Sequence, residues 1–246
     1  MPIFLVDNNG APININSPNP ILPTPLNITL VDHYLPYDTH NTYDITIDST
    51  QTIQTLLTSS PSQVDSWLLE TQSQSHSLPS PLLVGLDIEW RPNSQRGQSN
   101  PAATLQLCTN NRCLVFQFIH SPSIPASLFT FLGNPNNRFV GVGIESDVEK
   151  LIEDYNLSVR NFVDLRNLAA RVLDDRDLLR SGIKSLAERV LGKIVEKPQR
   201  ITRSRWDNLW LNADQVNSLF KNGENSFLAV ANRCCLIPID CDSVLC

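Results

Sequence analysis

The amino-acid sequence predicts an α/β domain in which a mixed five-stranded sheet is flanked by helices. The first sign is the run at 82–90, which is apolar except for two acidic residues and has the length of a buried strand. Strand-like segments follow at 104–109 and 112–118 about an Asn-Asn turn, which indicates an antiparallel meander. A strand at 138–143, a helix and a short strand at 162–165 come next. This order of elements predicts a mixed sheet with helices on its faces.

Helices are expected before and after these strands. A strand at 43–48 precedes a helix that opens at Ser60, the N-cap, and Pro61, its first residue. A linker rich in Ser, Gln and Pro at 71–80 then leads into the first core strand. Further helices are expected at 125–132, from a capping box of Ser146 and Glu149, at 183–190 before Gly192, and from a cap of Asn212 with Gln215.

Composition sets the boundaries and the broad class. Residues 1–28 predict a flexible arm, 29–236 one folded domain, and 237–246 a tail that contains cysteine. The 246-residue chain is 41% hydrophobic, which is enough for a core. It has no apolar run near the roughly 18–20 residues of a membrane span and no N-terminal signal peptide. We therefore expect an intracellular protein of the nucleus or the cytoplasm, with no membrane partner.

The six cysteines include no Cys-x-x-Cys pair, which argues against structural zinc. Four of them lie in the last thirteen residues, where oxidation or binding of a soft metal stays open. Reduced thiols are the expectation for an intracellular protein.

The charge of the chain is unevenly distributed. Its net charge of −6 argues against a generally basic nucleic-acid binder, but residues 176–205 carry nine basic and three acidic side chains. The alternative to phosphate binding is an ordinary solvated helix face. Candidate phosphate contacts are Lys184, Arg189, Arg203 and Arg205.

Asp87 and Glu89 are the most informative residues of the chain. They stand two positions apart in the otherwise apolar run at 82–90. Side chains at i and i+2 of a strand point to the same face, about 6.5–7 Å apart along the chain. Two carboxylates that converge in this way usually bind cations, and a pair of polar residues at a strand end is the simpler alternative.

Five blocks of the sequence together resemble the 3′-5′ exonuclease domain. The likeness is to the DEDD superfamily, and within it to the Werner-syndrome-like exonucleases of plant type, over roughly residues 40–235. An Asp-x-Glu pair alone is a weak signal, whereas five blocks in the same order are a strong one. The resemblance implies a ribonuclease H-like fold. The blocks are Val84 to Trp90, Phe139 to Asp147, Val163 to Arg166, Lys184 to Glu188, and Ser204 to Asp207 followed by Leu211 and Gln215.

The resemblance also implies catalysis with two Mg²⁺ or Mn²⁺ ions. In that family the first-motif aspartate bridges both ions, and the glutamate helps to hold the first ion and the attacking water. These roles correspond to Asp87 and Glu89. The second-motif aspartate, which holds the other ion through water, corresponds to Asp147, whose simpler role is that of a first-turn acid favoured by the helix dipole. Two ions about 3.5–4 Å apart stabilise the attacking and leaving oxygens of a phosphodiester.

The third motif departs from the family pattern, which is a helix reading Gln-Ile-x-Tyr-x-x-x-Asp. Alignment on Gln215 places Ser218 at the tyrosine and Asn222 at the catalytic aspartate. Asn222 can offer a metal a carbonyl oxygen but no charge, and Asn217 stands where one variant of the family has a general-base histidine. Glu224 lies about 200° further around the helix and should face away. We therefore expect an impaired first metal site.

Two functions of different class follow. The first is a metal-dependent 3′-5′ exonuclease that acts on single-stranded 3′ ends of DNA or RNA by two-metal-ion hydrolysis, weakened by Ser218 and Asn222. The alternative is an inactive pseudo-exonuclease that binds nucleic acid or partner subunits. The apolar C-terminal helix and the cysteine tail could also serve a homo-oligomeric interface.

Overall fold

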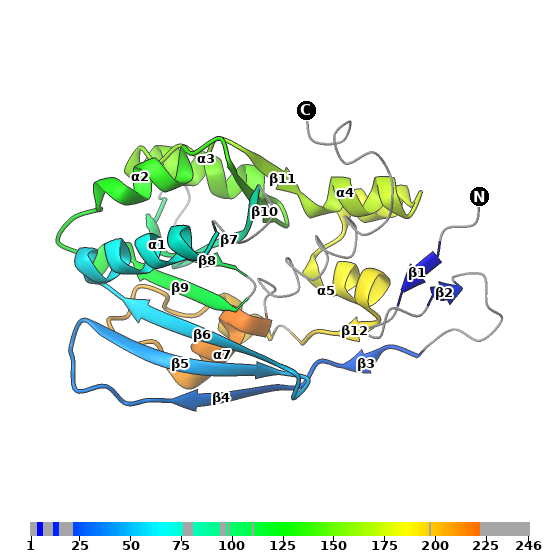
Figure 1. The fold of residues 1–246 in the computed structure, drawn as a ribbon, viewed down its shortest axis with the longest axis horizontal. Coiled ribbons are helices and arrows are strands. Elements are labelled where there is room, and N and C mark those ends of the chain that lie inside the picture. The colour runs from blue at the N-terminus through cyan, green and yellow to red at the C-terminus, as the bar shows by residue number, and fades with distance from the viewer. Residues whose placement is uncertain are drawn as a thin grey trace.

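A computed structural model of the chain describes residues 4–6, 12–14, 22–75, 81–93, 97, 99–109, 111–196 and 198–221. Its centre is a mixed eight-stranded sheet in the order β11-β10-β7-β8-β9-β6-β5-β4 (Figure 1). Helices pack on both faces of this sheet, and a hydrophobic cluster forms on each side. The predicted α/β class, with a mixed sheet flanked by helices, is confirmed.

All five predicted strands are present. β7 (Leu82–Trp90) pairs antiparallel with β8 (Ala102–Cys108), and β8 pairs in the same way with β9 (Arg112–Gln117), as the meander requires. β10 (Asn137–Gly141) runs parallel to β7 on one side and to β11 (Phe162–Asp164) on the other. Because these three strands are parallel, the helices that follow β10 and β11 begin at the same edge of the sheet at which β7 ends.

The sheet is wider than the predicted five strands. β4 (Ile28–Asp32), β5 (His40–Ile47) and β6 (Gln51–Thr58) form a second antiparallel meander, and β6 joins the core by parallel pairing with β9. Of these three, only β5 is predicted from the sequence. The others alternate polar and apolar residues over short lengths, because an extension with one face open to solvent needs no continuous apolar run.

Two small sheets lie outside the main one. β1 (Phe4–Val6) pairs with β2 (Pro12–Asn14), and β3 (Thr24–Pro25) pairs parallel with β12 (Lys193–Ile194). The backbone amide of Thr24 donates to the carbonyl of Gly192 at 3.0 Å. The last part of the predicted N-terminal arm is therefore hydrogen-bonded to the domain.

In the described part of the chain, helices cover both faces of the sheet. α1 (Pro61–Ser75), α2 (Ala126–Leu132) and α3 (Ile144–Tyr155) lie together on one face (Figure 1). Their apolar side chains share one cluster with those of β7, β8 and β9. α4 (Leu165–Val172), α5 (Ile183–Leu186) and α7 (Ala213–Lys221) contribute to the other. Shorter helical turns are Phe118–His120, Arg176–Arg180, the π-helical Ala187–Leu191, and α6 (Gln199–Thr202). Within the described part of the chain, no helix has the length and apolar character needed to span a membrane.

The helix ends test the predicted capping signals. α7 has its capping box, since Asn212 Oδ1 accepts from the amide of Gln215 at 2.8 Å and Gln215 Oε1 accepts from the amide of Asn212 at 3.1 Å. The turn at Gly192 is also as predicted, with φ of 65°. α3 instead begins at Ile144, ahead of the predicted box at Ser146, because Gly143 at φ 76° turns the chain directly out of β10.

A disulfide joins Cys108 and Cys113, whereas the sequence predicts reduced thiols. The two residues stand directly opposite each other at one end of β8 and β9, and both are fully buried. Strand register brings them together, and the predicted hairpin of 104–109 with 112–118 already implies this register. The prediction of reduced thiols is wrong because it considers the expected compartment and not this pairing.

Candidate active site

Asp87 and Glu89 lie on the face of β7 that is turned towards α7. The strand register places Gln106 opposite Asp87 and Thr104 opposite Glu89. Glu89 is only 8% exposed, Thr104 and Gln106 are buried, and Asp87 is half-buried. The intervening apolar residues of β7 point to the opposite face, into the cluster of α1, α2 and α3. The two carboxylates thus share a strand face with a row of buried polar side chains.

The helix of the third motif packs over this row. Gln106 Nε2 donates to the carbonyl of Leu219 in α7 at 3.3 Å. Because Gln106 is the neighbour of Asp87 across the strand pair, this hydrogen bond brings α7 to the first motif. Ser218 is 3% exposed, and among the described residues its Oγ has no hydrogen-bond partner. Asn222 and Glu224 lie outside the described residues.

Asp147 is in the first turn of α3 and is nearly buried. A Cβ added at Gly141 would lie 2.7 Å from the carbonyl oxygen of Leu86, so the end of β10 lies tightly against β7. One turn after Asp147, Lys150 Nζ lies 5.4 Å from the centroid of the Trp90 ring. α3 therefore starts, with Asp147 in its first turn, at the edge of the sheet at which β7 ends, and it packs on the face opposite to that of Glu89.

Asp164 and Arg166 support the start of α3. Asp164 Oδ2 accepts from the amide of Gly143 at 3.0 Å, and its Oδ1 accepts from the amide of Arg166 at 2.8 Å, which caps α4. The hydrogen bond that the Arg166 guanidinium donates to Asp164 raises the pKa of Arg166, and the charges of Asp164, Glu145 and Asp147 act in the same direction against burial. A permanent cation is thus fixed beside the acidic first turn, and the role of Asp164 is structural, since it holds the starts of α3 and α4.

The carboxylates have the right chemistry for Mg²⁺ or Mn²⁺, because hard cations take oxygen ligands. Among the described residues, no three His, Cys, Asp or Glu side chains are close enough together to hold a metal ion on their own. Mg²⁺ is usually bound by one or two carboxylates, with waters and substrate phosphates as the other ligands. The pair of Asp87 and Glu89 fits a site of this open kind.

The predicted phosphate contacts separate into two groups. Arg203 and Arg205 are exposed on the loop that precedes α7. Arg205 Nη2 lies 3.2 Å from Asp207 Oδ2, and this hydrogen-bonded contact lowers the pKa of Asp207 against a smaller opposing effect of burial. Lys184 and Arg189 are exposed on the helical segment that packs beside β12, and Arg189 forms an ion pair with Asp175.

Sequence reasoning misses the polar residues of β8 and β9 that complete this face. Gln106 and Thr104 occupy alternate positions of a wholly buried strand, and Gln117 stands opposite Thr104 on β9. Gln117 Nε2 donates to the carbonyls of Asn208 and Leu209, at 3.2 and 3.1 Å. Polar residues at every second position of an apolar strand are the signal that could have found them.

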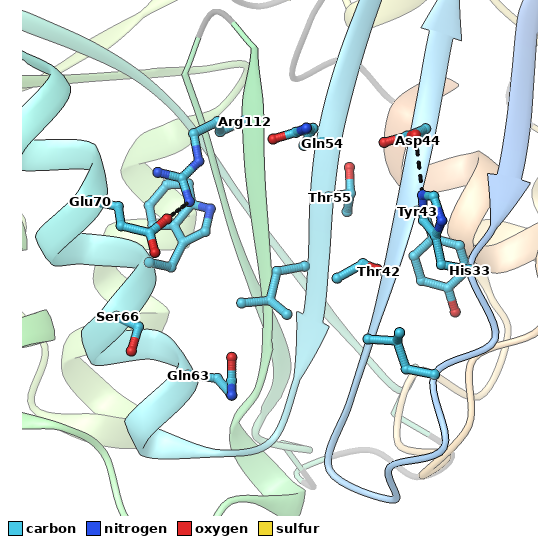
Figure 2. Close-up of a pocket in the computed structure, with 13 residues that line it drawn as sticks. His33, Thr42, Tyr43, Asp44, Gln54, Thr55, Gln63, Ser66, Glu70 and Arg112 are labelled. Carbon is cyan, nitrogen blue, oxygen red and sulfur yellow. Dashed lines mark hydrogen bonds and ion pairs between the residues drawn. The ribbon is translucent and has the colours of Figure 1, made fainter.

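A separate pocket of about 470 Å³ lies between α1, the strands β5, β6 and β9, and the segment after β4 that carries His33 and Leu35 (Figure 2). Its walls include two ion pairs, His33 with Asp44 at 3.1 Å and Arg112 with Glu70 at 2.5 Å. Arg112 and Gln54 are paired across β9 and β6, on the sheet face opposite to that of Asp87 and Glu89. This pocket is therefore distinct from the acidic site.

Comparisons with known proteins identify relatives of this chain. The model of the 3′-5′ exonuclease family matches residues 57–217. An Arabidopsis thaliana 3′-5′ exonuclease is 36% identical over 54% of this chain and 46% of its own length. The mouse bifunctional 3′-5′ exonuclease/ATP-dependent helicase WRN is 33% identical over 54% of this chain and 9% of its own. The chain thus spans less than half the length of both relatives.

The fold has a counterpart among solved structures. The crystal structure of Escherichia coli RNase D, an exoribonuclease involved in structured RNA processing, matches with a TM-score of 0.60 at 15% identity. The match covers 73% of this chain and 44% of RNase D. The family match over most of the chain, together with the ordered motifs, shows that this chain belongs to the 3′-5′ exonuclease family of the DEDD superfamily.

Proposed function

We propose that the chain is a metal-dependent 3′-5′ exonuclease, with residues 29–236 as its catalytic domain. The observation that carries the proposal is that Asp87 and Glu89 share one strand face, across which Gln106 holds α7, while α3 with Asp147 in its first turn begins at the same edge of the sheet. The family match over residues 57–217 supports it.

The protein residues would act by position and charge. Asp87, Glu89 and Asp147 would hold the divalent ions, which stabilise the attacking and leaving oxygens of the phosphodiester. Glu89, nearly buried beside Thr104, would orient the attacking water. The water oxygen forms a bond to phosphorus as the bond to the 3′ oxygen of the preceding nucleotide breaks, and a 5′-mononucleotide leaves. The backbone amides at the start of α3 favour negative charge near Asp147.

The substrate we propose is the 3′ end of a single strand of DNA or RNA. Contacts to phosphate dominate nucleic-acid affinity and do not depend on sequence. Arg203 and Arg205 are exposed on the loop next to the acidic row and would meet the strand as it enters.

A second candidate function is binding without hydrolysis, and Ser218 is the observation that favours it. A buried serine stands where the family pattern has a tyrosine that orients the water. Its hydroxyl is turned into the protein and has no hydrogen-bond partner in the described part of the chain. Asn222 would also bind a metal ion more weakly than the aspartate of the family pattern, because an amide carries no negative charge.

Release of a 3′-terminal label from a single-stranded oligonucleotide tests both candidates. We expect the wild type to release the label slowly with Mn²⁺. The Asn222→Asp variant should release it faster and should need a lower metal concentration, and the Asp87→Ala variant should release none. Equal rates for the wild type and Asn222→Asp would contradict the weakened first metal site. If neither releases label while both bind the oligonucleotide, the non-hydrolytic candidate is correct.

A further inference from the structure

Trp210 is the one exposed tryptophan of the four in the chain. It is 56% exposed, whereas Trp67 and Trp206 are buried and Trp90 is half-buried. Its neighbour Leu209 is also exposed, at 45%. The two side chains are adjacent in the chain, and an exposed apolar patch with polar residues at its rim is a feature of interaction sites.

The segment before Trp210 is anchored to three parts of the fold. Arg91, just beyond the end of β7, contacts Asp207 Oδ2 at 3.4 Å. His120 Nε2 lies within hydrogen-bond distance of the carbonyl of Asp207, at 3.1 Å. Gln117 holds the next two carbonyls, those of Asn208 and Leu209. The backbone that presents Trp210 is therefore fixed from three sides, which lowers the entropy lost when a ligand binds.

These anchors also place Trp210 at the rim of the acidic site. Gln117 is opposite Thr104, and Thr104 is opposite Glu89, in one row across three adjacent strands. Neighbouring strands are about 4.8 Å apart, so Gln117 lies about 10 Å from Glu89 along the row. Leu209, which accepts from Gln117, and Trp210 after it are within the reach of a few nucleotides of a strand that ends at Glu89.

The charges near Trp210 are complementary to a nucleic-acid backbone. Arg203 and Arg205 are exposed on the same loop. Among the described residues no ion pair involves Arg203, while Arg205 shares Asp207 with Arg91. Cationic side chains beside an aromatic platform are the combination with which proteins bind single strands without reading their sequence.

We propose that Trp210 stacks on a base of the single strand whose 3′ end lies at Asp87 and Glu89. This inference rests on the proposed function, and it adds a substrate-positioning residue. The platform accepts any base, because every base has a π-face. Arg203 and Arg205 bind the flanking phosphates.

Fluorescence anisotropy of a 5′-labelled oligo-dT strand, measured with the full chain in EDTA, tests this contact without turnover. Trp210→Ala should weaken binding roughly five- to hundredfold, as loss of one stacked base does elsewhere, and Trp210→Phe should restore most of it. Tyr37→Ala is the matched control, because Tyr37 is 54% exposed and lies in the loop between β4 and β5. This control should bind as the wild type does.

A strand with one abasic position, moved stepwise from the 3′ end, locates the stacked base. At one position the abasic site should weaken binding to the wild type and have no effect on Trp210→Ala. Equal affinity of the wild type and Trp210→Ala overturns the inference, as does a wild-type dimer that Trp210→Ala dissociates without loss of affinity for the oligonucleotide.

The two proposals fail in different ways. Release of 3′ nucleotides with no dependence of affinity on Trp210 would refute the stacking contact and leave the exonuclease function standing. Binding that depends on Trp210, with no hydrolysis under any metal, would support the contact and refute the hydrolytic function.

Discussion

Gln106 links the first and third motifs at the level of single residues. It faces Asp87 across the strand pair, and its amide nitrogen donates to Leu219 in α7. The Asp-x-Glu pair is predictable, because strand geometry puts i and i+2 on one face whatever the fold. The partnership of Gln106 with α7 is not, because 113 positions separate the two residues and only the packed fold joins them.

Replacing Gln106 should loosen α7 from the sheet. Gln106→Ala removes a buried hydrogen bond and leaves a space, so we expect a loss of about 2–3 kcal/mol in the free energy of unfolding. Urea denaturation gives this value. Gln117→Ala is the matched control, since it removes a glutamine of the same face that binds the loop and not α7. A Gln106→Ala variant as stable as the wild type would contradict the role of this contact.

The charge of Asp207, in the loop before α7, makes the stability of the protein depend on pH in a predictable way. Hydrogen bonding to Arg205 lowers the pKa of Asp207 in the folded protein. Its contribution to stability is therefore present at neutral pH and lost as the pH falls below about 4, where the carboxylate takes up a proton.

Asp207→Asn should accordingly destabilise the protein slightly at pH 7, by no more than about 1 kcal/mol, because ion pairs with an exposed partner contribute little. The difference from the wild type should shrink as the pH falls through the lowered pKa. Urea denaturation at a series of pH values measures this difference in the free energy of unfolding. A difference that is constant down to pH 3 would show that the charge of Asp207 is not its cause.

At the scale of elements, helix starts place the acidic residues. The capping box of Asn212 and Gln215 is predictable because its hydrogen bonds are local. The start of α3 is not, because it depends on Asp164, which comes from a strand 21 positions away and accepts from the amide of Gly143. The resulting shift leaves Asp147 within the first turn, where the sequence also puts it.

Gly143→Ala should destabilise the protein by about 1–2 kcal/mol, because φ at this position is 76° and alanine does not adopt it freely. Gly182→Ala is the control. Both glycines precede a helix as its N-cap, but φ at Gly182 is −84° and a Cβ there meets nothing within 4 Å. Thermal unfolding of the two variants compares them, and equal effects would show that the left-handed backbone is not the cause.

At the scale of the whole molecule, a core sheet with its two helical layers is extended by a second meander. The core is predictable because each of its strands carries an apolar run or a turn signal. The extension is less so, because the parallel pairing of β6 with β9 joins segments with no local relation. The disulfide differs, because its cysteines face each other in the predicted hairpin of β8 and β9, and only the expected reducing compartment argues against the bond.

The direction and metal dependence of strand shortening test the central claim most directly. A 5′-labelled single-stranded oligonucleotide is incubated with the wild type, Asp87→Asn or Glu89→Gln, with Mn²⁺, with Mg²⁺ and with EDTA, and the products are separated at one-nucleotide resolution. We predict a ladder that shortens from the 3′ end with the wild type and metal only. The account would be contradicted by a wild type that binds the strand but never shortens it. It would also be contradicted by an Asp87→Asn variant that shortens the strand at the rate of the wild type.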